Sequence, residues 1–127
     1  MINHPVWAQD LLLNALSWAE EKGYKAEIPN LVWRRCNKFG SGGHARQVYP
    51  VCITMNAGKD HTEQKIVLLH ELAHILNPNE GHTAKFWDTA WELFRWAKLP
   101  IRVCKIREGN YKKGALLAYD RSKRSSA

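Results

Sequence analysis

The sequence predicts one α+β domain, with an N-terminal helix, a small and mostly antiparallel sheet, and two further helices. The length of 127 residues suits a single domain, and 45% apolar with 24% charged residues is typical of a folded globular chain. Segments with helical apolar periodicity also flank two short runs of β-forming residues. We expect the domain to cover residues 1–101, with residues 102–127 as a basic C-terminal extension, either part of the same domain or a tail.

The first helix is predicted over residues 5–22. Pro5 suits the first turn of a helix, and Gly23 suits the position just beyond its end. Between them, tryptophan, leucine and alanine recur at helical spacing. We interpret this segment as a packing helix.

Two strands are predicted next, over residues 31–34 and 48–55, which are rich in β-branched and aromatic residues. Pro50 has no backbone N–H to donate to a sheet, so we expect the second strand to lie at an edge or to carry a bulge. The glycine-rich residues 40–43 lack the lysine and hydroxyl pattern of a phosphate-binding loop. They are interpreted as a hairpin loop between the strands.

The second helix is predicted to begin near residue 61 and to end at residue 76, before an Asn-Pro sequence. Asp60 can cap it, and Glu63 completes a pattern that resembles a capping box. The third helix is predicted over residues 83–98 with a wide aromatic face, and Pro100 ends it.

The second helix carries the residues with the clearest chemistry, His70, Glu71 and His74. Histidines four positions apart lie on one helix face, so both imidazoles can reach one metal ion. Glu71 then lies beside that ion, where it can take a proton from a zinc-bound water whose pKa is lowered to about 7. The alternative is that the histidines cap the core through hydrogen bonds to the backbone, with Glu71 exposed. Two imidazoles and a carboxylate are costly to bury in an apolar helix without a shared partner, which favours the metal.

A catalytic zinc ion takes three protein ligands and keeps one position open. The downstream candidates for the third ligand are Glu80, His82, Asp88 and Glu92. We expect His82, because it ends a short loop that can fold back over the second helix. Glu92 is the alternative, a carboxylate supplied by the following helix. Otherwise Asp88 and Glu92 would be hydrogen-bond acceptors around the site or plain surface carboxylates. The expected cofactor is one zinc ion.

These residues resemble the SprT-like and YgjP-like zinc metallopeptidases, which share a HELxH motif followed by H-x-x-x-F-W. The matching segments are residues 67–74 and 81–87, and the resemblance covers roughly residues 60–96. It implies a zincin-like fold, zinc on the three histidines named above, and Glu71 as the general base. The chain departs from the family in a slightly longer loop before the last histidine and in lacking the cysteine zinc ribbon of many SprT proteins.

The leading hypothesis is therefore a zinc metallopeptidase that hydrolyses protein or peptide substrates. An exposed edge of residues 48–54 would hold the substrate by strand addition. The group that stabilises the oxyanion stays open among Tyr49, Tyr111, His44 and several arginines. One alternative is a three-histidine nuclease similar to the YbeY-like ribonucleases, against which Glu71 counts. The other is a zinc-stabilised module that binds nucleic acid or protein without catalysis.

The net charge of +7 is concentrated at the C-terminal end, where residues 102–127 hold eight of the 19 basic and two of the 12 acidic residues. With Tyr111 and Tyr119 among them, these residues could contact the phosphates and bases of a nucleic acid. The alternative is a solubilising tail. Within this extension, one more hairpin is expected around residues 108–110.

The chain is expected to stay in the cytoplasm, because it has no basic signal-peptide region and no apolar run long enough for a membrane. Cys36, Cys52 and Cys104 form no Cys-x-x-Cys pair. We therefore expect buried free thiols in a reducing compartment rather than disulfides or a zinc ribbon.

Overall fold

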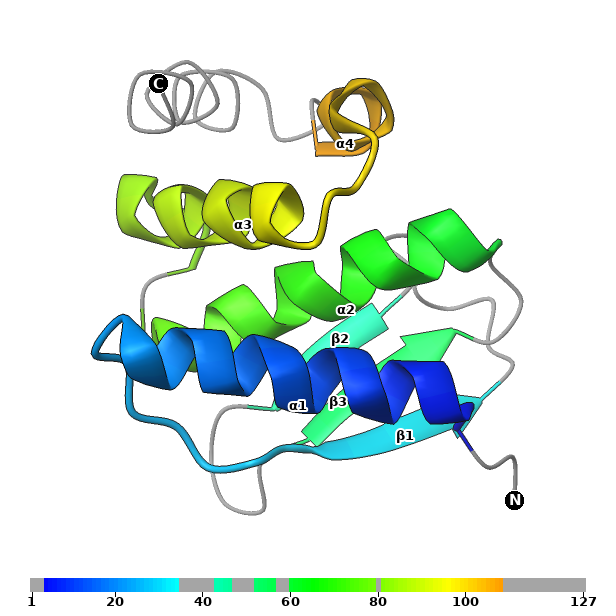
Figure 1. The fold of residues 1–127 in the computed structure, drawn as a ribbon, viewed down its shortest axis with the longest axis horizontal. Helices are drawn as coiled ribbons and strands as arrows, with labels where there is room; N and C mark the ends of the chain where they lie inside the picture. The colour runs from blue at the N-terminus through cyan, green and yellow to red at the C-terminus, as the bar shows by residue number, and fades with distance from the viewer. Residues whose placement is uncertain (1–3, 35–42, 47–51, 57–59, 80, 109–127) are drawn as a thin grey trace.

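The structure is a computed structural model that describes residues 4–34, 43–46, 52–56, 60–79 and 81–108. In chain order, its elements are α1 (Val6–Glu21), β1 (Asn30–Arg34), β2 (Gly43–Arg46), β3 (Cys52–Asn56), α2 (His61–Leu76), α3 (Ala84–Trp96) and α4 (Ile101–Glu108). The described chain is rich in helix and carries one small sheet (Figure 1). Within these residues, no helix is long and apolar enough to cross a membrane.

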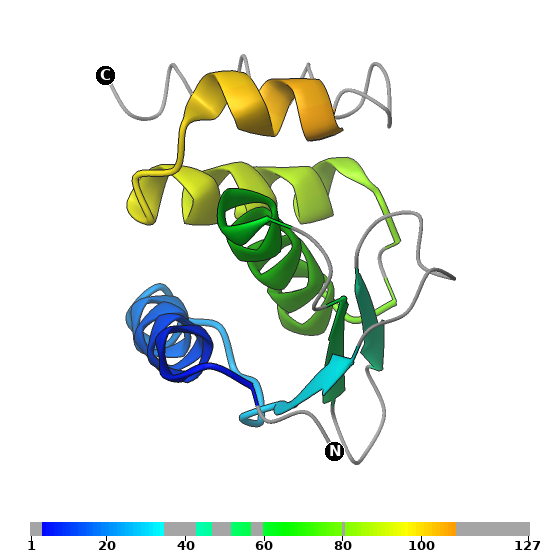
Figure 2. The ribbon, with the colours of Figure 1, turned by 90° about the vertical axis from the view of Figure 1, so that its right-hand side faces the viewer.

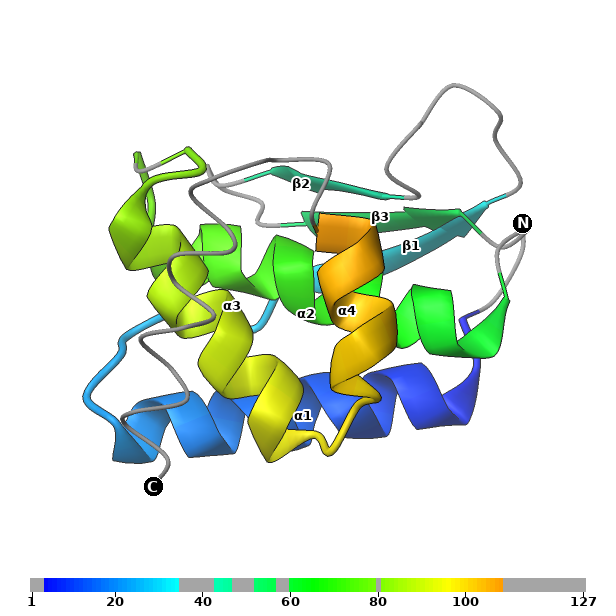
Figure 3. The same ribbon diagram turned by 90° about the horizontal axis from the view of Figure 1, so that it is seen from above.

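The helix α2 lies at the centre of the molecule and contacts α1, α3, β2 and β3. Figure 3 shows α2 between α1 and β2, and Figure 2 shows α3 over α2 with α4 above α3. The core is accordingly built from α2 and its neighbours. Its largest fully buried side chains are Trp87, Trp91, Phe86, Phe94, Leu12, Ile66, Leu68, Leu69, Leu72 and Leu93.

The sheet has the order β1-β3-β2, and it is mixed rather than mostly antiparallel. β2 pairs with β3 in the antiparallel direction, as expected, but β1 pairs with β3 in the parallel direction, with Leu31 opposite Ile53. The prediction of a mostly antiparallel sheet is wrong on this point. The direction of a pairing depends on how the chain returns to the sheet, which the strand residues themselves do not encode.

The second predicted strand is not an edge strand, because β3 lies between β1 and β2. Pro50 lies outside the described residues and precedes β3, so its missing N–H makes no gap in the described part of that strand. The edges of the described sheet are instead β1 and β2, and β2 begins at Gly43. The prediction of a plain hairpin loop was therefore wrong at Gly43, while residues 40–42 lie outside the described residues.

The first three helices match the predictions closely. The first ends as expected, with Gly23 at φ 94° and its N–H bonded to the Glu20 carbonyl. The backbone N–H of Tyr24 reaches the Ala19 carbonyl, which completes a Schellman motif. At the start of α2, the Asp60 side chain accepts a hydrogen bond from the Glu63 N–H at 2.9 Å, as the capping pattern predicts.

The expected hairpin around residues 108–110 is wrong for its described part, because α4 continues as a helix to Glu108. The Pro100 carbonyl accepts hydrogen bonds from the N–H groups of Val103 and Cys104, which starts the helix directly after the proline. Proline therefore separates two helices here rather than ending the helical part of the chain. Residues 109–127 lie outside the described residues.

Candidate metal centre

The predicted metal-binding residues of α2 lie at its buried face. His70 is 5% exposed and Glu71 is 6% exposed, while His74, one turn later, is half-buried. Glu71 is therefore not an exposed surface carboxylate. The end of this helix is held by Asn77, whose side-chain amide donates to the Ala73 carbonyl at 2.9 Å and to the Thr89 hydroxyl at 3.0 Å. This network fixes the point from which the loop to α3 departs.

The loop between α2 and α3 turns back through two left-handed residues, Asn79 at φ 70° and Gly81 at φ 58°. Asparagine and glycine are the residues that adopt this conformation at low cost. The reversal places His82 against α2, just before Thr83 begins the third helix. The left-handed conformations of Asn79 and Gly81 thus bring His82 close to His70 and His74.

The ligand atoms of His70, His74 and His82 all lie within 4.8 Å of one another. The Nε2 atoms of His70 and His82 are 3.3 Å apart. Two ligands at 2.0–2.1 Å from one tetrahedral zinc ion would be separated by about 3.3–3.4 Å. The three-imidazole donor set and the spacing of this pair therefore fit a zinc ion, and the wider separations in the group, within 4.8 Å, would have to shorten on binding.

The other candidate ligands do not join this group. Asp88 and Glu92 lie exposed on α3 and are not among the side chains that come together. Glu80 lies outside the described residues. Among the described histidines, cysteines and acidic residues, the three histidines form the group that could hold an ion.

Two aromatic side chains of α3 hold the imidazoles in place. The ring of Phe86 stacks on His74, with centroids 4.2 Å apart and planes at 25°. The ring of Trp87 stacks on His82 at 5.7 Å, also at 25°. Both aromatic residues are buried, so they form an apolar wall that orients the ligands. This contact gives the Phe-Trp pair of the sequence motif a physical role.

One polar residue of the site, Glu108 on α4, was not predicted from the sequence. A carboxylate oxygen of Glu108 lies 2.6 Å from Nδ1 of His70, and the residue is only 1% exposed. The available signal was its charge, because Glu108 is one of two acidic residues in an otherwise basic extension. Its partner, 38 positions earlier, could not be found from that charge alone.

The electrostatics of the site favour a neutral imidazole at His82 and a neutral thiol at Cys104. Burial and the neighbouring His70 lower the pKa of His82, against an opposing effect of Glu108. Neutral imidazole is the form that binds metal. Cys104 is a free, buried thiol whose pKa is raised to about 12 by burial and then by the charge of Glu108. It is therefore protonated at neutral pH and does not supply a thiolate ligand.

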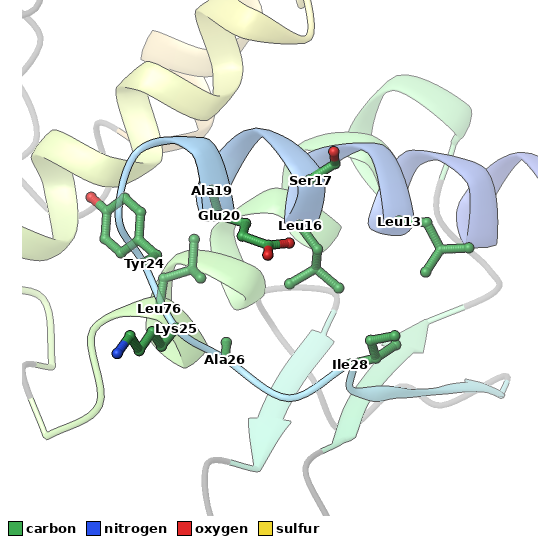
Figure 4. A pocket seen from close by; sticks show the side chains of 10 residues that line it. All are labelled: Leu13, Leu16, Ser17, Ala19, Glu20, Tyr24, Lys25, Ala26, Ile28 and Leu76. Atoms are coloured by element: carbon green, nitrogen blue, oxygen red, sulfur yellow. The ribbon is translucent and has the colours of Figure 1, made fainter.

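A pocket of about 430 Å³ lies away from these residues, between α1, the segment that follows it, and the end of α2 (Figure 4). It is lined by Leu13, Leu16, Ser17, Ala19, Glu20, Tyr24, Lys25, Ala26, Ile28 and Leu76. None of the metal-site side chains lines it. Of the residues considered for the oxyanion, Tyr49 and Tyr111 lie outside the described residues, as does the side chain of His44.

No family model matches the chain, and no curated protein or solved structure matches it.

Proposed function

We propose that this protein is a zinc-dependent metallopeptidase with a zincin-like fold, similar to the SprT-like and YgjP-like families. The observation that carries the proposal is the convergence of His70, His74 and His82 beside the buried Glu71. Three imidazoles drawn together on a zinc ion would leave one coordination position open for a reactant, as catalytic zinc sites do. The proposed substrate is a protein or peptide.

In this proposal, the three histidines hold one zinc ion, and Glu71 moves the proton. Bound zinc would supply Lewis acidity, which polarises the scissile carbonyl and acidifies the attacking water. A carboxylate oxygen of Glu71 accepts the proton of that water and then delivers it to the nitrogen of the leaving amine. Its burial favours this role, because a carboxylate in a site of low dielectric interacts strongly with a nearby proton donor.

The substrate would bind along β2 by adding a strand to the sheet. In the described sheet, β2 pairs with β3 on one side only, so its other backbone edge is available. β2 also packs against α2, the helix that carries Glu71. An extended peptide on this edge would therefore run beside the histidines. This assigns the substrate edge to Gly43–Arg46 instead of the residues 48–54 expected from the sequence.

Two alternatives fit the same histidines less well. A zinc site that only stabilises the fold usually has four protein ligands, whereas the described group has three. A three-histidine nuclease does not explain a buried glutamate directly after the first ligand.

The buried, free thiol of Cys104 agrees with a reducing compartment, and we propose that the protein is cytoplasmic.

The deciding experiment compares wild type with Glu71→Gln on an unfolded protein and on a peptide library. The amide keeps the shape of the side chain and leaves the zinc ligands intact, but it cannot accept the proton. We expect turnover to fall by about 10²–10⁴-fold, with zinc content and melting temperature unchanged.

Glu92→Gln is the matched control, because it makes the same chemical change at an exposed position on α3. It should keep wild-type turnover. Equal turnover by wild type and Glu71→Gln would exclude the peptidase mechanism and favour the binding module.

A further inference from the structure

The buried carboxylate of Glu108 needs a partner, and His70 is the partner that the structure shows. Glu108 is 1% exposed and His70 is 5% exposed, and the two side chains meet at 2.6 Å. A carboxylate buried to this degree is costly unless a hydrogen-bond donor meets it. The contact is thus a requirement of the packed state and not a chance approach of two surface groups.

The direction of this hydrogen bond fixes which nitrogen of His70 faces the metal position. An ionised carboxylate only accepts hydrogen bonds, so we assign the proton of this 2.6 Å contact to Nδ1 of His70, which then donates it. In a neutral ring, Nε2 then keeps its lone pair, and this atom is the one that lies 3.3 Å from Nε2 of His82. Metal-binding histidines are commonly oriented by a carboxylate in this way.

The helix α4 is anchored so that it aims Glu108 at α2. Cys104, one turn before Glu108 and on the same helix face, is fully buried in the core. The neighbouring Arg107 forms an ion pair with Glu63, which lies two turns before His70 on α2. The Arg107–Glu63 ion pair and the Glu108–His70 contact join the end of α4 to one face of α2, the face that carries the histidines of the proposed metal centre.

We propose that Glu108 is a positioning residue of the metal centre, which holds His70 in the Nδ1–H tautomer and thereby makes α4 part of the metal-binding unit. The inference rests on the proposed function for the identity of the metal. It concerns a residue in the segment 102–127 that sequence analysis interpreted as a basic extension. The acidic side chain acts through His70 and does not touch the metal itself.

The test measures zinc affinity by competition with a chelator, on the full chain and its variants. Glu108→Gln keeps the size of the side chain and an oxygen acceptor but removes the charge, whereas Glu108→Ala removes both. We expect zinc affinity to fall by about 10-fold in Glu108→Gln and about 100-fold in Glu108→Ala. Glu92→Gln, the same change on the exposed face of α3, should bind zinc as the wild type does.

A second measurement needs no metal. Nitrogen-15 NMR of the metal-free protein reports which ring nitrogen of His70 carries the proton. We expect the Nδ1–H tautomer in wild type and a shift toward Nε2–H in Glu108→Ala, which a packing role alone would not produce. If Glu108→Ala does not fold, Glu108→Gln carries the test through both measurements.

The outcomes separate this inference from the proposed function. If the wild type binds zinc and both Glu108 variants bind it equally well with an unchanged tautomer, the positioning role is wrong and the peptidase proposal stands. If the wild type binds no zinc, the proposed function is wrong, and the role of Glu108 falls with it.

Discussion

Replacing His82 with alanine tests the metal centre at the ligand that the α2–α3 loop supplies. The side chain of His82 is the most exposed of the three histidines, and its ring contacts Trp87, Phe86 and the other two histidines. Loss of an aromatic contact of this kind costs about 0.5–1 kcal/mol. The metal-free variant should therefore fold and melt only a few degrees below the wild type.

The effect of zinc on stability should change far more. With free zinc at 100 times its dissociation constant, a ligand that binds only the folded state adds about 2.7 kcal/mol. If losing His82 weakens binding about 100-fold, the same zinc concentration adds only about 0.4 kcal/mol. For a chain of 127 residues, 1 kcal/mol corresponds to about 4 °C in melting temperature. Zinc should thus raise the melting temperature by about 10 °C in wild type and by about 2 °C in His82→Ala.

The assay is thermal unfolding at fixed zinc and again after chelation, with two comparison variants. His70→Ala should lose the zinc-induced rise and should also destabilise the metal-free protein, because it leaves the buried Glu108 without the donor at 2.6 Å. Glu92→Ala should keep the full rise. A full rise in His82→Ala together with a lost rise in Glu92→Ala would refute the assignment of the third ligand.

Two further outcomes follow from other parts of the chain. Lys98 lies at φ 57° after α3, in a Schellman motif in which the N–H of Leu99 donates to the Phe94 carbonyl. Because glycine adopts this left-handed conformation at lower cost than lysine, Lys98→Gly should raise the free energy of unfolding, measured by urea titration, by about 0.5–1 kcal/mol. An unchanged or lower value would contradict this reading. The basic residues of 102–127, including exposed Arg102 and Lys105 on α4, predict binding of single- or double-stranded DNA. With about three or four phosphates neutralised, this binding weakens with salt at a log–log slope of about −2 to −4. Reversing Arg102 and Lys105 to glutamate should weaken this binding, while Lys22→Glu, at the C-cap of α1, should not. No binding at low salt would remove nucleic acid as a partner.

Features that depend on neighbours in the chain could be predicted from the sequence. The caps at Asp60 and Gly23 are local patterns, and both formed as expected. The approach of His82 to α2 also has a local origin, since Asn79 and Gly81 provide the two left-handed residues that the reversal needs. Loop chemistry therefore made the contact between His82 and α2 predictable.

Features that depend on distant neighbours could not be predicted in this way. The central position of β3 follows from pairing with β1 and β2 together, and neither its own residues nor Pro50 determine that arrangement. The sheet order is a property of the whole chain path.

The helix α4 escaped prediction for a related reason. Its apolar residues Val103 and Ile106 are β-branched, and they lie on the outer face, 40% and 71% exposed. The residues that it buries are Cys104 and Glu108, which give no apolar stripe to recognise. The position of α4 therefore depends on its contacts with α2 and α3, which its own sequence does not show.

In the proposed metal centre, the contact between His70 and Glu108 would link metal binding to the docking of α4. Any ligand that needs His70 in its observed orientation binds better when Glu108 is in place, and by reciprocity its binding stabilises the docked helix. Arg102 and Lys105 lie on the exposed face of that same helix. A polyanion bound to Arg102 and Lys105 would therefore contact the same helix whose inner face, through Glu108, holds His70 in its orientation. If the two sites are coupled, DNA should change the zinc affinity by the same factor by which zinc changes the DNA affinity. If they are not coupled, neither affinity should change.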